Sequence, residues 1–313
     1  MTEKVKFGNT GIMVTPITMG TWGIGGAGWD DNPDEVRLDA IKAAVENGIN
    51  FIDTAPAYNA GRSEQYIGEA LEQIGARTDV CISTKCGNRY IDGQYIRNGR
   101  PDYIFEDCEK SLSYLRTDYI DVMLVHWPDP NVPLSETFGA LEELKKQGKI
   151  RHIGVSNFTR EQILEVRKTS EIEVLQLHYS MLHRDNEELL KWAHSEGIAT
   201  MAYGTLTGGL LTGRYREYKE YVANDNRNRF YGKYFKEPYF SKVIGILKVM
   251  QPIADRHDAE LAEVAINWVR QKDYVDTCIV GAQRRGRVES NLKSLNWELS
   301  SAEMEELDLK GKV

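Results

Sequence analysis

Short apolar segments recur along this chain and alternate with helical patterns. Eight of them have the length and composition of β-strands: 16–22, 49–54, 80–85, 119–127, 150–156, 174–179, 198–203 and 277–282. Several are apolar almost throughout, which is typical of parallel strands buried on both faces. Because parallel neighbours need a long crossover between them, usually a helix, this alternation leaves few possible folds.

Helical patterns fill the intervals between these segments. Apolar residues repeat at helical spacing in three of the intervals: 34–47, 63–74 and 135–147. A glycine follows each one as a stop signal. Thr159 and Gln162 form a capping-box pattern ahead of a further helix. Eight βα units without a linker predict a (β/α)8 TIM barrel, with residues 1–313 as a single domain.

Two stretches depart from this repeat. Residues 5–15 predict a β-hairpin with an Asn-Thr-Gly turn, which we expect to plug the N-terminal end of the barrel. Residues 204–276, between the seventh and eighth strands, are far more than one helix needs. Their first part, 213–240, is rich in Tyr, Arg and Lys with little periodicity. We therefore expect a mobile loop there, on the C-terminal face where barrels build their active sites.

Composition excludes several classes of function. The formal net charge of −8 argues against a nucleic-acid partner, which would require a basic face. No apolar run approaches the roughly 18–20 residues of a membrane span, and the N-terminus lacks the apolar core of a signal peptide. The four cysteines are scattered without C-x-x-C spacing, so we expect buried thiols and no metal site. Free thiols fit a cytoplasmic protein.

A glycine run after the first strand fits the dinucleotide-binding pattern G-x-G-x-x-G, at Gly23, Gly25 and Gly28. In a Rossmann site such glycines open a helix whose N-terminus meets the pyrophosphate. Here the helix is predicted to begin near Pro33, after the run has ended. The run is therefore interpreted as a flexible loop above the first barrel strand.

Four titratable side chains stand at or just beyond the ends of consecutive strands: Asp53, Tyr58, Lys85 and His126. In a barrel these positions converge on one pocket. The hydroxyl of tyrosine has an ordinary pKa near ~10, and we expect the Lys85 ammonium to lower it by stabilising the phenolate. Asp53 would hold the ammonium, and a neutral His126 could orient a carbonyl oxygen. The set predicts a site that protonates a carbonyl oxygen while hydride reaches the carbon.

Each of these residues has a structural explanation when taken alone. Asp53 could cap a turn, Lys85 could be a solvated strand end, and Tyr58 could be a packed aromatic. His126 could be a buried histidine with its hydrogen bonds satisfied. The presence of all four at matching strand ends favours the catalytic interpretation.

The chain resembles the aldo-keto reductases over essentially its whole length. The motifs that carry the resemblance are FIDTAPAYNAGRSEQYIG (51–68), ISTKCG (82–87), LVHWPD (124–129), GKIRHIGVSNF (148–158) and YGTLTGGLLTGRY (203–215). The resemblance implies Tyr58 as general acid, Lys85 and Asp53 as the partners that set its pKa, and His126 as the residue that orients the carbonyl.

It also implies a nicotinamide cofactor bound across the barrel mouth without a Rossmann domain. The residues implied to contact the cofactor are Thr21, Trp22, Asp53, Ser156, Asn157, Gln176, Tyr203, Gly204, Leu206, Gly208, Gly281, Gln283, Arg284, Arg287 and Asn291. Among them Tyr203 would stack on the nicotinamide ring and Asn291 would contact the adenine. Arg284, Arg285 and Arg287 form either a solvated basic turn or a 2′-phosphate site. We favour the latter on charge matching, and with it NADPH over NADH.

The sequence departs from the family pattern at a few positions. Asn59 stands where a glycine commonly follows the tyrosine, Gly204 replaces a common phosphate-contacting serine, and Gly281 replaces a lysine found in part of the family. His178 stands where relatives often carry an acid. These changes concern the pocket entrance and the phosphate contacts, and the four catalytic candidates remain.

The residues expected to contact substrate are Trp22, Trp29, Tyr58, His126, Trp127 and His178, with Tyr90 and the 213–240 loop as further walls. His178 shares a strand face with Gln176, so it could point toward the pocket mouth and titrate near neutrality. The alternative is a packed imidazole bonded to a neighbouring backbone group. Aromatic walls with polar edges suit sugars and aromatic carbonyls alike.

The leading hypothesis is an NADPH-dependent reductase of a small aldehyde or ketone, including a sugar or a related polar carbonyl. A second hypothesis is a cofactor-binding regulatory subunit of the same fold with little turnover. A barrel hydrolase or lyase without cofactor is not supported, because no acid pair or metal set is found. The sequence leaves the substrate and the oligomeric state open.

Overall fold

The eight predicted strands form a closed parallel barrel in the computed structural model, which describes residues 3–26, 28–91, 94–217 and 225–311. Around the barrel the strand order is β10-β11-β12-β3-β4-β5-β8-β9. The strands are β3 (Ile17–Gly20), β4 (Phe51–Asp53), β5 (Cys81–Cys86), β8 (Ile120–Val125), β9 (Ile150–Ser156), β10 (Val174–His178), β11 (Ala199–Tyr203) and β12 (Thr277–Gly281). Each overlaps one predicted segment, so the predicted TIM barrel is confirmed.

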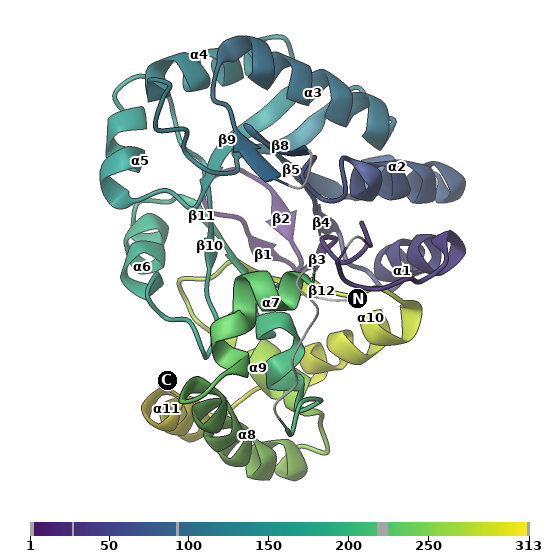
Figure 1. Cartoon of the computed structure of the whole chain (residues 1–313), viewed down its shortest axis with the longest axis vertical. Helices are drawn as coiled ribbons and strands as arrows, with labels where there is room; N and C mark the ends of the chain where they lie inside the picture. Colours follow the sequence, from purple (N-terminus) through teal and green to yellow (C-terminus); the bar gives the residue numbers. More distant parts are fainter. Residues whose placement is uncertain (1–2, 27, 92–93, 218–224, 312–313) are drawn as a thin grey trace.

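Helices surround the barrel, with α1 to α6 following one another around its outside (Figure 1). The α-helices are α1 (Asp34–Glu46), α2 (Arg62–Ile74), α3 (Pro101–Leu115), α4 (Leu134–Lys146), α5 (Arg160–Val166), α6 (Glu187–Ser195), α7 (Asn226–Tyr231), α8 (Tyr239–Arg256), α9 (Leu261–Arg270), α10 (Arg285–Leu292) and α11 (Ser301–Lys310). Short 3-10 helices lie at η1 (Arg77–Asp79), η2 (Thr207–Thr212), η3 (Gly232–Phe235) and η4 (Lys293–Asn296). The capping box at Thr159 and Gln162 is confirmed at the start of α5.

The predicted N-terminal hairpin is confirmed as β1 (Val5–Lys6) paired antiparallel with β2 (Met13–Val14). Phe7 beyond β1 is fully buried and meets the ring of Phe51 edge to face, with 5.2 Å between ring centroids. Phe51 begins a barrel strand, so the hairpin fills the N-terminal end of the barrel with an aromatic side chain.

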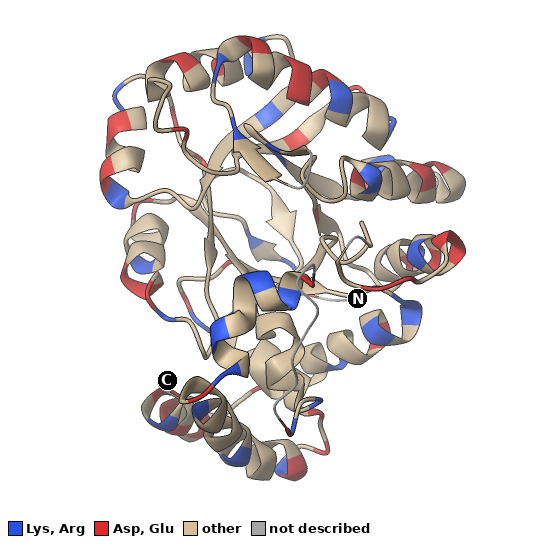
Figure 2. Cartoon of the chain, viewed as in Figure 1, with Lys and Arg blue, Asp and Glu red and all other residues tan. Residues whose placement is uncertain are grey.

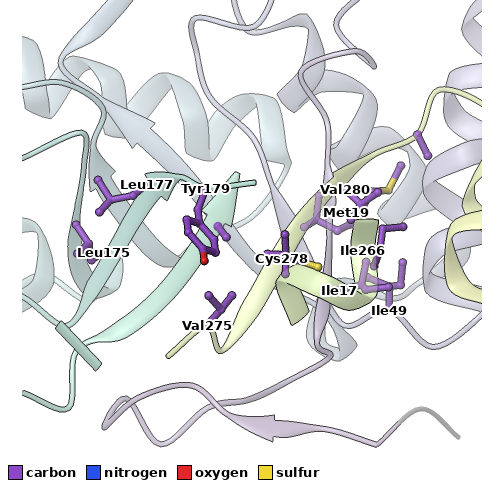
Figure 3. Close-up of a cluster of buried hydrophobic side chains, with 14 of the residues drawn as sticks. Ile17, Met19, Ile49, Leu175, Leu177, Tyr179, Ile266, Val275, Cys278 and Val280 are labelled. Atoms are coloured by element: carbon purple, nitrogen blue, oxygen red, sulfur yellow. The ribbon is translucent and has the colours of Figure 1, made fainter. Parts of the chain in front are cut away.

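Strand alternation divides the core into an inner and an outer layer. Side chains that point away from the barrel axis pack against the helices, and Figure 3 shows several of them: Ile17 and Met19 of β3, Leu175 and Leu177 of β10, and Cys278 and Val280 of β12. The inner layer is smaller and contains Phe7, Val14, Phe51, Cys81, Val122, Leu124, Val174, Ala199, Met201 and Ile279. All four cysteines are buried free thiols.

The segment between β11 and β12 is more regular than predicted. The described part of 213–240 includes α7, η3 and the first two residues of α8, so the expected lack of regular structure is wrong there, whereas the expected mobility stays a prediction. The periodicity was hidden because α7 is only 6 residues long, less than two turns. Residues 218–224 of this segment lie outside the described residues.

A second hairpin, which the sequence pattern did not predict, follows β5. It pairs β6 (Asn88–Ile91) with β7 (Gln94–Arg97). In Figure 1, α7 crosses in front of the barrel. Hairpin and α7 lie close together, because the rings of Tyr95 and Phe230 are 6.5 Å apart. Within the described part of the chain, no helix has the length and apolar character needed to cross a membrane.

Candidate active site

The predicted site residues continue the inner layer of the barrel toward the C-terminal ends of the strands. Side chains two residues apart on a strand share a face. Asp53 therefore follows inward-facing Phe51, and Gln176 follows inward-facing Val174. Lys85 extends the same inward row from Cys81 on β5. The apolar plug below and the polar groups above are thus one continuous column inside the barrel.

Lys85 and Asp53 form a buried ion pair at the centre of the site. The Lys85 Nζ atom lies 2.9 Å from Oδ2 and 3.0 Å from Oδ1 of Asp53. It also donates to the carbonyl oxygen of Thr54 at 2.8 Å and to the hydroxyl oxygen of Tyr58 at 3.3 Å. An ammonium has three N–H donors, and these three partners use all of them. Lys85 is therefore fixed in one orientation, with one donor aimed at Tyr58.

Further donors hold the Asp53 carboxylate in place. The Ser83 hydroxyl donates to Oδ1 at 2.8 Å, and the Gln176 side-chain amide donates to the same oxygen at 2.7 Å. Buried charges are tolerated when they are paired and hydrogen-bonded in this way. The sequence analysis did not identify Ser83 or the Thr54 carbonyl as part of the site. The available signals were the position of Thr54 directly after Asp53 and the pairing of Ser83 with Asp53 on the neighbouring strand.

Tyr58 is held as a neutral phenol. Burial, and then the negative charge of Asp53, raises its pKa well above the usual value. The predicted lowering of this pKa by Lys85 is therefore wrong, because desolvation of the phenolate outweighs the nearby ammonium. The hydroxyl oxygen accepts from Lys85, so its own hydrogen is left to donate elsewhere. This arrangement suits a proton donor.

His126 lies beside Tyr58, with 6.2 Å between the ring centroids and a nearly perpendicular orientation. Burial, and then the charges of Lys85 and Arg97, holds the pKa of His126 well below its usual range, so the imidazole is neutral. Its Nδ1 atom is buried without a partner among the described residues. A buried polar atom without a partner is costly, and a bound polar group would satisfy it.

Four of the residues predicted to contact the cofactor, Ser156, Asn157, Gln176 and Tyr203, lie together. The Asn157 amide nitrogen donates to the Ser156 hydroxyl at 3.0 Å and to the His126 carbonyl at 3.1 Å. The Tyr203 hydroxyl donates to Oδ1 of Asn157 at 2.8 Å. Gln176 is tied to Asp53, as described above. The structure thus joins these four predicted cofactor residues to the catalytic candidates in one hydrogen-bonded network.

Other predicted cofactor residues surround this network. Thr21 is fully buried, and its hydroxyl donates to the Asp53 carbonyl at 2.8 Å. Gly204 and Gly208 both have positive φ, and a Cβ atom on Gly208 would lie 2.7 Å from the Tyr231 ring. Leu206 immediately precedes η2, which begins at Thr207. Gly204 and Gly208 give the chain after β11 a tightly turned backbone with little side-chain bulk, as a phosphate-contacting turn requires.

The predicted adenosine end lies at β12 and the start of α10. Asn291 is buried, and its Oδ1 atom has no partner among the described residues. Gln283 packs against Gly23, where a Cβ atom would lie 2.5 Å from its amide nitrogen. The solvent-facing Gly281 ends β12. An unpartnered Asn291 oxygen beside a small residue fits the binding of a polar ring such as adenine.

The three arginines of this segment differ in their partners. Arg285 is held by Asp39 at 2.6 Å and by Glu46 at 2.8 Å. Arg287 lies 3.6 Å from Glu260 and is half-exposed. In the described part of the chain, the Arg284 side chain has no hydrogen bond or ion pair, and Arg284 occupies the cap position before α10. The side chains of Arg284 and Arg287 could therefore bind an anion, whereas Arg285 is already paired with two acids of α1.

Aromatic side chains lie at the mouth of the barrel near the tetrad of catalytic candidates, Asp53, Tyr58, Lys85 and His126. Trp22 stacks on Tyr58 with 6.0 Å between centroids and meets Trp29 and Phe230 edge to face at 5.0 Å and 4.6 Å. Of the further predicted wall residues, Tyr90 packs on Tyr95 at 4.9 Å. The sequence analysis did not single out Phe230 or Tyr95. Their only signal was the aromatic character of their segments.

His178 lies in a stack of three rings. Its imidazole is parallel to that of His183 at 4.0 Å and to the Tyr203 ring at 5.1 Å. Burial, and then the neighbouring His183 and Lys233, lowers its pKa to about 3, so the expectation that it titrates near neutrality is wrong. With both faces covered, the ring can reach a substrate only by its edge. Its predicted contact with substrate stays a prediction.

Replacing His178 by leucine tests its role. The unfolded chain binds this proton near pH ~6.5, whereas folded His178 stays neutral down to about pH 3. Below pH ~6.5 the unfolded state therefore holds more protons, so stability decreases as the pH falls, by about 2 kcal/mol at pH 5 from this group. We expect the variant to have a lower Tm at pH 7 and a smaller loss of stability between pH 7 and pH 5, with an unchanged substrate ranking. A changed ranking with an intact Tm would assign His178 to the substrate site.

The glycine run is confirmed as a loop that opens no helix. Helix α1 begins at Asp34, six residues after Gly28. The Arg37 guanidinium donates to the carbonyls of Gly23 and Ile24 at 3.1 Å and 3.0 Å, which fixes the loop to the helix behind it. Asp53, which could be mistaken for the ribose-binding acid of a Rossmann site, is instead the partner of Lys85.

Comparison with known proteins agrees with this geometry. The profile of the Aldo/keto reductase family matches residues 16–312. Aldo-keto reductase YhdN of Bacillus subtilis (strain 168) is 35% identical over 308 residues, which cover 98% of this chain and 92% of that protein. The NADH-specific methylglyoxal reductase of Escherichia coli (strain K12) is 35% identical over 318 residues, covering 96% of each.

A solved structure is also similar over nearly the whole chain. The glycerol dehydrogenase AKR11B4 from Gluconobacter oxydans superimposes with a TM-score of 0.88 at 30% identity, covering 98% of this chain and 94% of that one. Profile, sequence and structure all agree with a barrel of this family. The chain therefore belongs to the aldo/keto reductase family of oxidoreductases, which use a nicotinamide cofactor.

Proposed function

We propose that the protein is an NADPH-dependent reductase of small polar aldehydes or ketones, with Tyr58 as the general acid. The observation that carries this proposal is that every N–H donor of the Lys85 ammonium already has an acceptor. Its three donors are used by Asp53, Thr54 and Tyr58, so the Tyr58 oxygen accepts and its hydrogen can only be donated away from Lys85. A carbonyl oxygen between Tyr58 and His126 would receive that hydrogen.

Each residue has a separate task in this mechanism. The neutral His126 donates a hydrogen bond that orients the carbonyl oxygen, and the apolar surroundings of Trp22 and Phe230 exclude water. The nicotinamide, when bound, supplies hydride to the carbonyl carbon. Tyr58 then transfers its proton to the developing alkoxide, and the adjacent ammonium stabilises the phenolate that remains. Asp53 keeps Lys85 charged throughout.

Ser156, Asn157, Gln176 and Tyr203 would hold the nicotinamide, because their side chains already form one network with Asp53 and His126. Arg284 and Arg287 would hold the 2′-phosphate of NADPH, because no carboxylate among the described residues lies closer to either than the 3.6 Å of Glu260. The related E. coli protein is NADH-specific by its name, so the preference for NADPH is a proposal about these two arginines. The related methylglyoxal reductase and glycerol dehydrogenase support a small polar substrate. Four buried thiols support a location in the cytoplasm.

Turnover and binding measurements test the proposal together. Methylglyoxal and glyceraldehyde would be incubated with the protein and either NADPH or NADH, and consumption of the cofactor would be followed by its absorbance. We expect turnover of both aldehydes, with kcat/KM at least about tenfold higher with NADPH. Binding of NADPH, measured by fluorescence, without any turnover would favour a regulatory subunit. The absence of binding would overturn both hypotheses.

A further inference from the structure

The barrel mouth carries positive charge although the chain as a whole is acidic, with a net charge of −8. Figure 2 shows Lys and Arg segments on α7 in front of the barrel, whereas the outer helices carry both signs. The cations concerned stand on α7 and on the β6–β7 hairpin. The question is which of them are already neutralised by neighbours.

Two of these arginines already form ion pairs with carboxylates. Arg227 lies 2.7 Å from Asp225, and Arg89 lies 2.5 Å from the buried Asp107. For Arg97 and Arg229, by contrast, the described residues provide no side-chain hydrogen bond and no ion pair. Each guanidinium instead lies over an aromatic ring: Arg97 is 4.8 Å from the centroid of Trp127 and Arg229 is 4.4 Å from that of Tyr95.

Both rings belong to the site. Trp127 directly follows His126, and Arg97 is one of the charges that hold the pKa of His126 down. Tyr95 packs on Phe230, which packs on Trp22, which stacks on Tyr58. Tyr95 and Arg97 are two residues apart on β7 and therefore share a face of that strand. The Arg229 guanidinium thus lies on the aromatic chain that leads to Tyr58, and the Arg97 guanidinium lies on the ring next to His126.

Most acids of the surrounding segments are already bonded. Asp30 is paired with Arg37 at 2.7 Å and Asp225 with Arg227. Asp129 accepts from the backbone amides of Gly99 and Asn131. Asp31, exposed on the loop above β3, and Asp129 have no ion pair with a cation among the described residues. Among the described residues, the rim therefore offers two guanidinium groups, those of Arg97 and Arg229, that no carboxylate neutralises by direct contact.

We propose that the site prefers aldehydes or ketones that carry a carboxylate, and that Arg97 and Arg229 bind this carboxylate. A guanidinium that lies flat on a ring is held in orientation while the donors at its edge remain available, and its fork matches a carboxylate. The anionic end of the substrate would lie at the rim, and its carbonyl would lie below, between Tyr58 and His126. This inference rests on the proposed carbonyl reductase activity and specifies its substrate class.

A matched pair of substrates tests the charge alone. 4-Carboxybenzaldehyde and 4-carbamoylbenzaldehyde have the same shape, but only the first is an anion. The readout is the ratio of kcat/KM for the acid to kcat/KM for the amide, measured at low ionic strength. We expect a ratio of about ten or more in the natural protein, and a decrease of about fivefold to tenfold in each of Arg97→Gln and Arg229→Gln. The ratio should also decrease as salt is raised, because salt screens exposed charges.

Arg151→Gln is the control. Arg151 is exposed and lies 3.7 Å from the centroid of the Tyr119 ring, but it stands at the start of β9, at the opposite end of the barrel. The substitution Arg151→Gln removes the same charge from the protein, and we expect it to leave the acid-to-amide ratio of kcat/KM unchanged. An equal decrease in all three variants would assign the effect to net charge and overturn the proposal.

The outcomes separate this inference from the function on which it rests. If neither aldehyde is reduced, and methylglyoxal is not reduced either, the proposed reductase function fails. If both benzaldehydes are reduced with a ratio near one, and the Arg97 and Arg229 variants do not change it, the reductase stands and the preference for a carboxylate is overturned.

Discussion

Replacing Tyr58 by phenylalanine is expected to lower kcat by at least ~100-fold, which is the lower end of what general acid catalysis contributes. The change removes one oxygen and its proton and leaves the ring that packs on Trp22. The affinity for NADPH should stay nearly constant, because none of the residues proposed to hold the cofactor is altered. Single-turnover kinetics would show the loss in the chemical step.

A matched variant guards against an indirect effect. Tyr234→Phe also removes a buried hydroxyl, which donates to the Leu182 carbonyl at 2.8 Å outside the tetrad. It should lose about 1 kcal/mol of stability, the ordinary contribution of one hydrogen bond, and keep its kcat. Near-normal turnover by Tyr58→Phe would remove Tyr58 from the role of proton donor.

The double variant Arg284→Ala, Arg287→Ala is expected to weaken NADPH binding strongly and NADH binding hardly at all. A hydrogen bond to a charged group contributes about 1.5–3 kcal/mol, so each lost contact should raise the Kd for NADPH by a factor between about 10 and about 150. Fluorescence titration with the two cofactors gives both dissociation constants directly.

Arg285→Ala is the control within the same turn. Its guanidinium is held by Asp39 and Glu46, so its loss should loosen the contact between α10 and α1 without changing the ratio of the two Kd values. If the double variant weakens NADH as much as NADPH, the two arginines only shape the loop, and the preference for a 2′-phosphate is wrong.

The barrel and the catalytic candidates were predictable because their signals are local. Each strand is a short apolar run between helix stop signals, and the alternation of β-strands places Asp53 and Lys85 on the inward face without any knowledge of the structure. Once a barrel is assumed, their convergence follows from the fold.

The contacts that Phe230 and Tyr95 make over the site could not be predicted in this way. Phe230 packs on Trp22 and Tyr95, which are more than one hundred residues away in the sequence. Its helix, α7, is too short to show a periodic pattern. The pKa values of Tyr58 and His178 were misjudged for a related reason. They depend on burial by residues from several strands and loops, and burial opposes the charged form of each group.

Helix α7 contacts the loop above β3, and this has a kinetic consequence. The Asn226 amide donates to the Gly28 carbonyl at 3.0 Å, the Arg227 guanidinium donates to the Trp29 carbonyl at 3.1 Å, and Phe230 meets Trp22. These contacts must all break before α7 can separate from the loop, so the open state is a minor population. If a cofactor lies beneath this crossing, its entry and its release wait for that minor population, so the rate of opening would set the rate of cofactor exchange.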